Sequence, residues 1–222
     1  MEIINVEARY KEVFSLPEEF MQTLPKKLIL FTTVQYFNSL NNIQKQLENQ
    51  GIAVKLIKPR HTCYNGQILG CSNQEIIEEG DFLFIGDGLF HPKALLLKNT
   101  RTVYVFNPKT EESFVLTTKD VEGMKKKIWA NYVKFLSSKK IGVLLTTKFG
   151  QYKPQLMESL KKDFPDKEFY FFLDNTYDFA SLENFPFIDC FLNTMCERIG
   201  YDDSDVQGLS ILNVEDLYSL NK

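Results

Sequence analysis

The stretch KKLILFTTVQYFNSLNNIQKQLENQGIAVKLI, residues 26–57, decides the fold class of this chain. Its apolar run at 28–33 predicts a buried strand, and the helical spacing of apolar side chains from Tyr36 to Leu47 predicts an amphipathic helix. A second apolar run at 52–57 follows a glycine, which is typical of a helix end. Strand, helix and strand in this order form a β-α-β unit, which places two parallel strands in one sheet.

The alternation of strand-like and helix-like segments continues along the chain. Further strands are predicted at residues 81–86, 102–107, 141–147, 168–174 and 188–193. Helices are predicted near residues 91–99, along 121–136 and around 156–160. Because continuous apolar strands joined by helical crossovers are typical of parallel sheets covered on both faces, the sequence predicts an α/β fold with flanking helices.

Two parts of the sequence resemble each other. KKLILFTTVQY (26–36) and KKIGVLLTTKFGQY (139–152) both run from a lysine pair through an apolar strand to a Thr-Thr ending. DFLFIG (81–86) and DCFLNT (189–194) hold corresponding places, each with an aspartate opening an apolar strand. We therefore expect two similar parallel-sheet domains related by internal duplication.

The repeat also sets the predicted domain boundaries. The first α/β domain covers residues 26–118 and carries Cys71, and the second covers residues 119–222 and carries Cys196. The two cysteines break the symmetry, because Cys71 precedes the third strand of its half whereas Cys196 follows the corresponding strand. Duplication alone therefore does not explain why they are there.

The composition excludes several classes of protein. With 222 residues, of which 44% are hydrophobic, the chain has the composition of a folded protein of one or two domains. No apolar run approaches the about 20 residues that cross a membrane, and the N-terminus lacks a secretory signal, so we expect a cytoplasmic chain without a membrane partner. A net charge of -3 argues against direct nucleic-acid binding. In a reducing cytoplasm, four cysteines are more often free, metal-bound or catalytic than disulfide-bonded.

Polar or glycine-containing loops follow several of the predicted strands, where open α/β sheets place their ligand-binding groups. Lys148 and Arg198 are suited to holding a carboxylate, and Asp87 and Asp202 are suited to an amine or hydroxyl groups. Glycines in these loops permit tight turns and a close approach of a ligand. Turn chemistry alone would account for the glycines of any single loop.

Four motifs in these loops resemble those of a known enzyme family. They are GQILGCS (66–72), FIGDGLFHPKAL (84–95), TTKFGQ (146–151) and FLNTMCERIGYDD (191–203). In their order and spacing they resemble successive motifs of the diphthamide biosynthesis enzyme 2-(3-amino-3-carboxypropyl)histidine synthase. VEARY (6–10) extends the resemblance to nearly the whole chain, and several motifs in order are more specific than a lone glycine loop.

The resemblance implies a fold, a cofactor and a reaction. Three related α/β domains would each supply one cysteine to a central 4Fe-4S cluster, which leaves one iron for S-adenosylmethionine. The 3-amino-3-carboxypropyl group of S-adenosylmethionine would then pass, by radical chemistry, to a histidine of translation elongation factor two. By position, Cys71 matches the metal ligand of the second domain and Cys196 that of the third.

The same motifs imply the residues that would bind S-adenosylmethionine, with Arg198 expected to hold its carboxylate. Those residues are Gly66, Gln67, Gly86, Asp87, His91, Lys148, Gly150, Gln151, Arg198 and Asp202.

The chain departs from the family pattern in two places. It begins where the first domain of the family is ending, and residues 1–25 resemble the end of that domain, so one cysteine ligand is missing. The usual Cys-Pro-Arg of the third motif reads Cys-Glu-Arg at residues 196–198. Cys63, Cys190 and the histidines are weaker candidates for the third ligand, because Cys190 lies in an apolar strand and Cys63 fits no tight ligand spacing.

Three functions stay open from the sequence. The chain is part of an active enzyme that a homologous subunit or a separately encoded first domain completes, or it is a non-catalytic partner of a complete homologue. In the third interpretation, it is a module that binds a nucleotide or S-adenosylmethionine.

Overall fold

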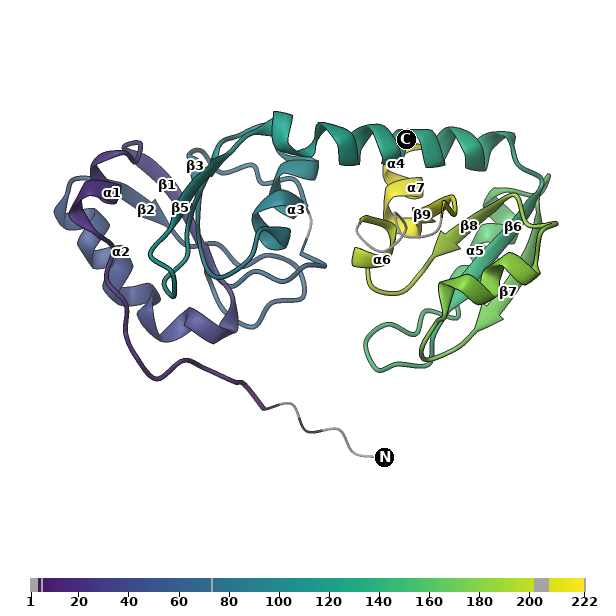
Figure 1. The fold of residues 1–222 in the computed structure, drawn as a ribbon, viewed down its shortest axis with the longest axis horizontal. Coiled ribbons are helices and arrows are strands. Elements are labelled where there is room, and N and C mark those ends of the chain that lie inside the picture. The colour runs from purple at the N-terminus through teal and green to yellow at the C-terminus, as the bar shows by residue number, and fades with distance from the viewer. Residues whose placement is uncertain (1–3, 5, 73, 202–207, 222) are drawn as a thin grey trace. The chain divides into compact units, whose positions relative to one another are not determined.

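The structure is a computed structural model that describes residues 4, 6–72, 74–201 and 208–221. The chain separates into two compact units, residues 1–122 and residues 123–222, and each unit is a sheet with helices packed on it (Figure 1). The sequence placed this division after residue 118, the first residue of the short helix that leads into helix α4 (Glu122–Ser137). Across the described ranges, no helix is long and apolar enough to cross a membrane.

The first unit is built on a sheet with the strand order β2-β1-β3-β4-β5. Its strands are β1 (Lys27–Thr32), β2 (Ala53–Lys55), β3 (Asp81–Ile85), β4 (Val103–Phe106) and β5 (Ser113–Leu116). The helical segments are α1 (Glu18–Gln22), η1 (Val34–Ser39), α2 (Leu40–Asn49), α3 (Phe90–Lys98) and η2 (Thr118–Val121). Strands β2, β1, β3 and β4 are parallel, whereas β5 pairs antiparallel with β4.

Alternate side chains of β1 and β3 face opposite sides of this sheet, as the pleat of a strand requires. On one side, Leu28, Leu30 and Leu83 share a hydrophobic core with the apolar side chains of α1 and α2. On the other side, Phe84 stacks on His91 of α3 with ring centroids 5.8 Å apart. Helices therefore cover both faces of the sheet.

Part of the N-terminal segment belongs to this core. Leu16, Phe20, Met21 and Leu24 are buried with the apolar side chains of β1 and α2. The sequence assigned residues 1–25 to the end of a preceding domain. In the structure, the later part of that stretch packs into the first unit.

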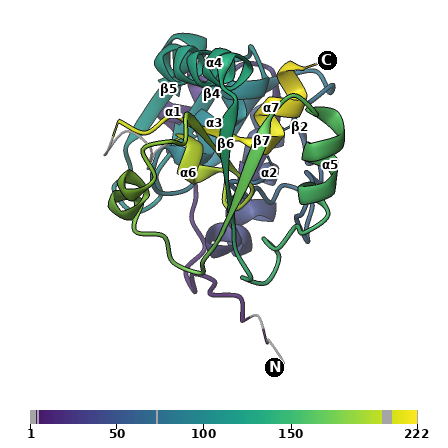
Figure 2. The same cartoon turned by 90° about the vertical axis from the view of Figure 1, so that its right-hand side faces the viewer.

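The second unit is built on a sheet with the strand order β7-β6-β8-β9, all parallel. Its strands are β6 (Lys140–Leu145), β7 (Glu168–Leu173), β8 (Cys190–Asn193) and β9 (Ile211–Asn213). After α4, its helical segments are α5 (Leu156–Asp163), η3 (Phe179–Asn184), α6 (Arg198–Tyr201) and α7 (Val214–Leu220). Figure 2 shows α5 and α7 on one side of β6 and β7.

Two hydrophobic cores lie on the two faces of this second sheet. On one face, Val143 and Leu192 are buried with Phe135 of α4, Leu160 of α5 and Leu217 of α7. The other face buries a separate cluster, which includes Leu144, Phe191, Leu182 and Met195. The sheet of the second unit is therefore also covered on both faces.

The predicted fold class is confirmed. The orders β2-β1-β3-β4 and β7-β6-β8-β9 are the same arrangement, with β1 equivalent to β6 and β3 to β8, as the repeat indicated. The antiparallel strand β5 of the first unit lies outside this shared order. In a parallel sheet all four equivalent strands end at one edge, and the loops that leave this edge carry the candidate site.

Candidate functional site

Gly66 and Gln67 extend the first sheet at the carboxyl end of β1. The Thr32 N–H donates to the Gly66 carbonyl at 2.8 Å, and the Ile68 N–H donates to the Thr32 carbonyl at 2.9 Å. Gly66 has a φ of 80°, and a Cβ on it would lie 2.7 Å from Cδ2 of Leu40. The motif that begins at residue 66 is thereby fixed to the carboxyl edge of the sheet.

The Gln67 side chain is buried and organises a turn. Its Oε1 accepts hydrogen bonds from the backbone N–H of Cys63 at 2.7 Å and of Tyr64 at 3.2 Å. A buried amide oxygen with two backbone donors holds the chain of residues 63–67 in one conformation. In this structure, Gln67 therefore holds the loop in shape.

Cys71 is exposed on a short turn whose ends are fixed. The Ser72 hydroxyl, which is buried, accepts from the Leu69 N–H at 3.2 Å and donates to the Arg60 carbonyl at 2.8 Å. Gly70 lies against the ring of Phe90, where a Cβ would overlap the ring. The glycine before Cys71 is therefore required for packing, and the turn presents the thiol at a defined place beside the first residue of α3.

The loop after β3 carries Asp87 and, at the start of α3, His91. The Asp87 carboxylate is 3.4 Å from the Lys109 ammonium. Burial raises the pKa of the neighbouring Tyr36, and the negative charge of Asp87 raises it further. His91 is half-buried between Phe84, on which it stacks, and Phe90, which it meets edge to face.

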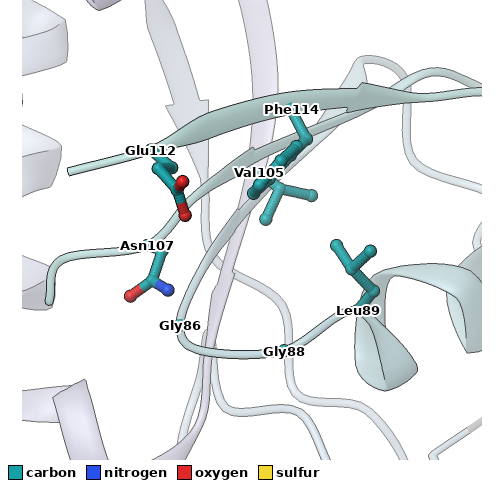
Figure 3. Close-up of a pocket in the computed structure, with 7 residues that line it drawn as sticks. All are labelled: Gly86, Gly88, Leu89, Val105, Asn107, Glu112 and Phe114. Atoms are coloured by element: carbon teal, nitrogen blue, oxygen red, sulfur yellow. The ribbon is translucent and has the colours of Figure 1, made fainter. Parts of the chain in front are cut away.

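A pocket of about 200 Å³ opens beside this loop, between Gly86 and Gly88 on one side and β4 and β5 on the other (Figure 3). Val105, Leu89 and Phe114 give it an apolar lining, whereas Asn107 and Glu112 lie together at its polar end. Gly86, which directly follows β3, donates its N–H to the Phe106 carbonyl at 3.0 Å. The pocket belongs entirely to the first unit.

In the second unit, the loop that carries Lys148, Gly150 and Gln151 leaves the carboxyl end of β6. Its first residues are held by Asn175, whose Oδ1 accepts from the Thr147 hydroxyl at 2.7 Å and the Thr147 N–H at 3.1 Å. The Gln151 N–H donates to the Lys148 carbonyl at 3.0 Å, which closes a turn. The Lys148 side chain is exposed, as a residue that binds an anion requires.

Cys196 is also exposed, on the loop that leaves the adjacent strand β8. The fully buried Asn193 donates through Nδ2 to the Cys196 carbonyl at 2.9 Å and to Oδ1 of Asn213 at 2.7 Å. Asn213 in turn donates to the Glu197 carbonyl at 2.9 Å. Two buried asparagines therefore hold the backbone carbonyls of Cys196 and of the residue that follows it.

Arg198 is the first residue of α6 and is exposed. The short helix is packed tightly, because Gly200 lies against the Asn213 side chain with no room for a Cβ. The Tyr201 hydroxyl, 3.4 Å from Glu197 Oε2, is buried. The remaining candidate, Asp202, lies outside the described residues.

The structure groups the candidate residues by unit. Each group lies on loops at the carboxyl edge of adjacent parallel strands, β1 and β3 in the first unit and β6 and β8 in the second. Sequence reasoning missed the residues that hold these loops, namely Ser72, Asn175, Asn193 and Asn213. Of these, Ser72 and Asn193 stood within quoted motifs, and for Asn193 the available signal was an asparagine at the end of an apolar strand.

The four cysteines differ in chemistry. Cys190 is buried in the second unit, and burial raises the pKa of its thiol to about 11, which keeps it protonated. Cys63, Cys71 and Cys196 are exposed. Within the residues that the structure describes, no three metal-binding side chains form a group. Thiolates on accessible loops are the ligands that 4Fe-4S clusters use, so Cys71 and Cys196 fit such a cluster in kind, and each unit offers one of them.

The motif order, the duplicated fold and the two cysteine loops agree with one family. The model of the diphthamide synthesis protein family matches residues 3–214. The chain belongs to this family. The match covers both units and every candidate site residue.

Individual relatives agree with this assignment. The chain is 30% identical over 204 residues to 2-(3-amino-3-carboxypropyl)histidine synthase of Pyrococcus horikoshii, a match that covers 88% of this chain and 58% of the relative. It is 26% identical over 181 residues to the synthase of Methanocaldococcus jannaschii, covering 80% of this chain and 47% of that one. The chain thus spans about half the length of the curated relatives it matches.

A solved structure is also similar. The crystal structure of Dph2 from Pyrococcus horikoshii with a 4Fe-4S cluster has a TM-score of 0.77 and 27% identity, covering 90% of this chain and 59% of that chain. The similar protein therefore carries a cluster of the kind that the resemblance implied.

Proposed function

We propose that this chain takes part in the first step of diphthamide biosynthesis, the transfer of the 3-amino-3-carboxypropyl group of S-adenosylmethionine to a histidine of translation elongation factor two. The observation that carries the proposal is the pair of exposed cysteines. Each is exposed on a loop fixed by buried polar side chains at the carboxyl edge of a parallel sheet, and the resemblance assigns each the role of a metal ligand. Family membership and the cluster-bearing relative support it.

In this proposal, Cys71 and Cys196 are two of the three protein ligands of one 4Fe-4S cluster. A bound cluster supplies one-electron reduction, the chemistry that cleaves S-adenosylmethionine in radical enzymes. The chain itself holds the thiolates and the substrate. Arg198 and Lys148, both exposed cations, bind the carboxylate of S-adenosylmethionine, and Asp87 binds its amine.

The remaining proposed substrate contacts come from the same loops. Backbone groups of Gly66, Gly86 and Gly150 border the bound S-adenosylmethionine, since glycine permits the closest approach. Gln151, His91 and Asp202 supply polar groups, and Gln67 acts through the turn that it holds.

The third cluster ligand is proposed to come from outside these 222 residues, with a homologous subunit or a separately encoded first domain as its source. The chain covers 58% of the Pyrococcus horikoshii relative, so that relative has a large part that finds no match here. A cluster held by only two thiolates has a further iron without a protein ligand, and a cluster on these residues alone should be labile. We place the protein in the cytoplasm, where reduced thiols persist.

The test is an anaerobic transfer assay. The chain is reconstituted with iron and sulfide and mixed with S-adenosylmethionine, dithionite and elongation factor two, with and without the family's first domain as a separate chain. Transfer, followed by the mass of the factor, is expected only in the complete mixture. Cys71→Ala should abolish it, and Cys63→Ala is the matched control that should retain it.

The alternatives give different results. Binding of S-adenosylmethionine with no transfer in the complete mixture would indicate a binding module. No binding and no transfer, with stable association to a complete homologue, would indicate a non-catalytic subunit. Full turnover by the chain alone would show that this chain supplies the third ligand itself.

A further inference from the structure

The N-terminal arm, defined here as residues 6–15, lies along η1 and the start of α2 without forming a helix or strand of its own. The Tyr10 N–H donates to the Gln35 carbonyl at 2.7 Å, and the Phe14 N–H donates to the Ser39 hydroxyl at 2.9 Å. Asn42 donates through Nδ2 to the Phe14 carbonyl at 3.0 Å. The arm is thus attached to the first unit by backbone hydrogen bonds.

Arg9 of this arm lies over two aromatic rings of the first unit. Its guanidinium carbon is 5.2 Å from the ring centroid of Phe37 and 5.1 Å from that of Tyr64. The centroids of these two rings are 4.8 Å apart. Glu7 Oε2 accepts from Arg9 Nη2 at 2.6 Å and from Nε at 2.9 Å, and this ion pair lowers the pKa of Glu7. A guanidinium held over two aromatic rings and paired with a carboxylate is a directional contact that a lysine does not reproduce.

Tyr64 connects this contact to the Cys71 turn. The Tyr64 N–H donates to Gln67 Oε1, and the Gln67 N–H donates to the Tyr64 carbonyl at 3.2 Å. The same stretch reaches back to Arg60, whose carbonyl accepts from the Ser72 hydroxyl. A continuous chain of contacts therefore runs from Arg9 through residues 60–67 to the turn that presents Cys71.

We propose that Arg9 is a positioning residue that fixes the loop of residues 59–72, and with it the Cys71 thiol, by clamping the N-terminal arm onto Tyr64. Its functional meaning rests on the proposed function, in which Cys71 is a cluster ligand. The loop has little regular structure between β2 and β3, so a few side-chain contacts decide how long it stays closed. The clamp links the N-terminal arm of the first unit to the geometry of a proposed metal ligand.

Amide hydrogen exchange on the full chain without iron tests the clamp. Arg9→Ala should raise the exchange rates of residues 59–72 by about tenfold, because two cation–π contacts and an ion pair are lost. Exchange in β6 should not change. Lys11→Ala removes an exposed positive charge from the same arm and is the matched control, expected to leave the loop unchanged.

A conservative variant separates stacking from charge. Arg9→Lys keeps the positive charge beside Glu7 but loses the planar group, so exchange of residues 59–72 should stay well above that of the unchanged protein. Full rescue by lysine would overturn the claim that the guanidinium is required. If Arg9→Ala does not fold, Glu7→Gln, which weakens the clamp without removing Arg9, should still raise loop exchange by about threefold.

The cluster provides a second measurement. With the first domain added, Arg9→Ala should lose the iron–sulfur absorbance faster than Lys11→Ala. Unchanged exchange of residues 59–72 in Arg9→Ala would overturn the clamp, whatever the iron content. Faster loop exchange combined with no cluster on the unchanged protein would leave the clamp standing and refute the proposed function.

Discussion

Two asparagines account for the position of Cys196. Asn193 and Asn213 are buried and hydrogen-bonded to each other, and their remaining donors reach the carbonyls of Cys196 and Glu197. A buried polar group is costly when it loses its partner, so the pair favours a single backbone path through residues 193–200. The exposed Cys196 thiol therefore projects from a backbone segment that these hydrogen bonds fix in place.

Substitution of Gly200 tests how tightly this segment is packed. A Cβ at residue 200 would overlap the Asn213 side chain, so Gly200→Ala should destabilise the second unit by about 2 kcal/mol. Gly123→Ala is the matched control, because Gly123 is a helical residue of α4 with nothing near its Cβ position, and it should stabilise by about 0.5 kcal/mol. Urea unfolding followed by circular dichroism measures both, and equal effects would contradict the packing argument.

At the scale of the elements, the length of the buried apolar run decides what the sequence could predict, and the buried strand β9 of only three residues was missed. Strands β1 and β6 are buried along almost their whole length, and their apolar runs identified them and the repeat. Residues 52–57 form only the short edge strand β2, on which Ala53 and Lys55 are exposed. Strand β5 is mostly exposed and pairs antiparallel with β4. It therefore has neither a continuous apolar run nor a helical crossover before it, and the sequence did not predict it.

The sequence likewise predicted some features of the candidate site and not others. Loops that follow apolar strands could be placed from the sequence, since parallel strands end at one edge. Several of the contacts that shape those loops could not, because they join residues far apart in the chain. Asn213 lies 20 residues from its partner Asn193, and Arg9 lies far from Tyr64.

The start of β8 makes the second unit sensitive to acid. Asp189 Oδ2 accepts from the N–H groups of Lys140 at 3.0 Å and Lys139 at 3.2 Å, which tie β8 to β6. These hydrogen bonds, chiefly the one from Lys140, lower the pKa of Asp189 below its ordinary value of 3.8. The stabilisation is therefore complete above that value and is lost as the pH falls through the lower pKa of the folded state.

Asp189→Ala should cost the second unit about 0.5–1 kcal/mol at neutral pH, a small value because the carboxylate is exposed to solvent. The difference in the free energy of unfolding between this variant and the unchanged protein should shrink towards zero in strong acid, where both proteins lack the negative charge at residue 189. Urea titrations at a series of pH values measure it, with the exposed Glu183→Ala of the same unit as the control. A difference that does not vary with pH would show that the charge is not what matters.

At the scale of the whole molecule, one duplicated topology carries two cysteines on different loops. Cys71 lies between β2 and β3, whereas Cys196 lies between β8 and α6, although β3 and β8 are equivalent strands. Both loops nevertheless lie at the carboxyl edges of their sheets. Duplication by itself does not account for the two cysteines, and in the proposed function each unit supplies one of them to the cluster.

The central claim is that Cys71 and Cys196 bind one and the same cluster. The measurement is bound iron and acid-labile sulfide after anaerobic reconstitution with the first domain of the Pyrococcus horikoshii relative, for Cys71→Ala, Cys196→Ala, the double variant and the control Cys63→Ala. A shared cluster predicts that each single variant loses as much iron as the double variant, while Cys63→Ala retains it. Separate losses that add up in the double variant, or an equal loss in Cys63→Ala, would contradict the account.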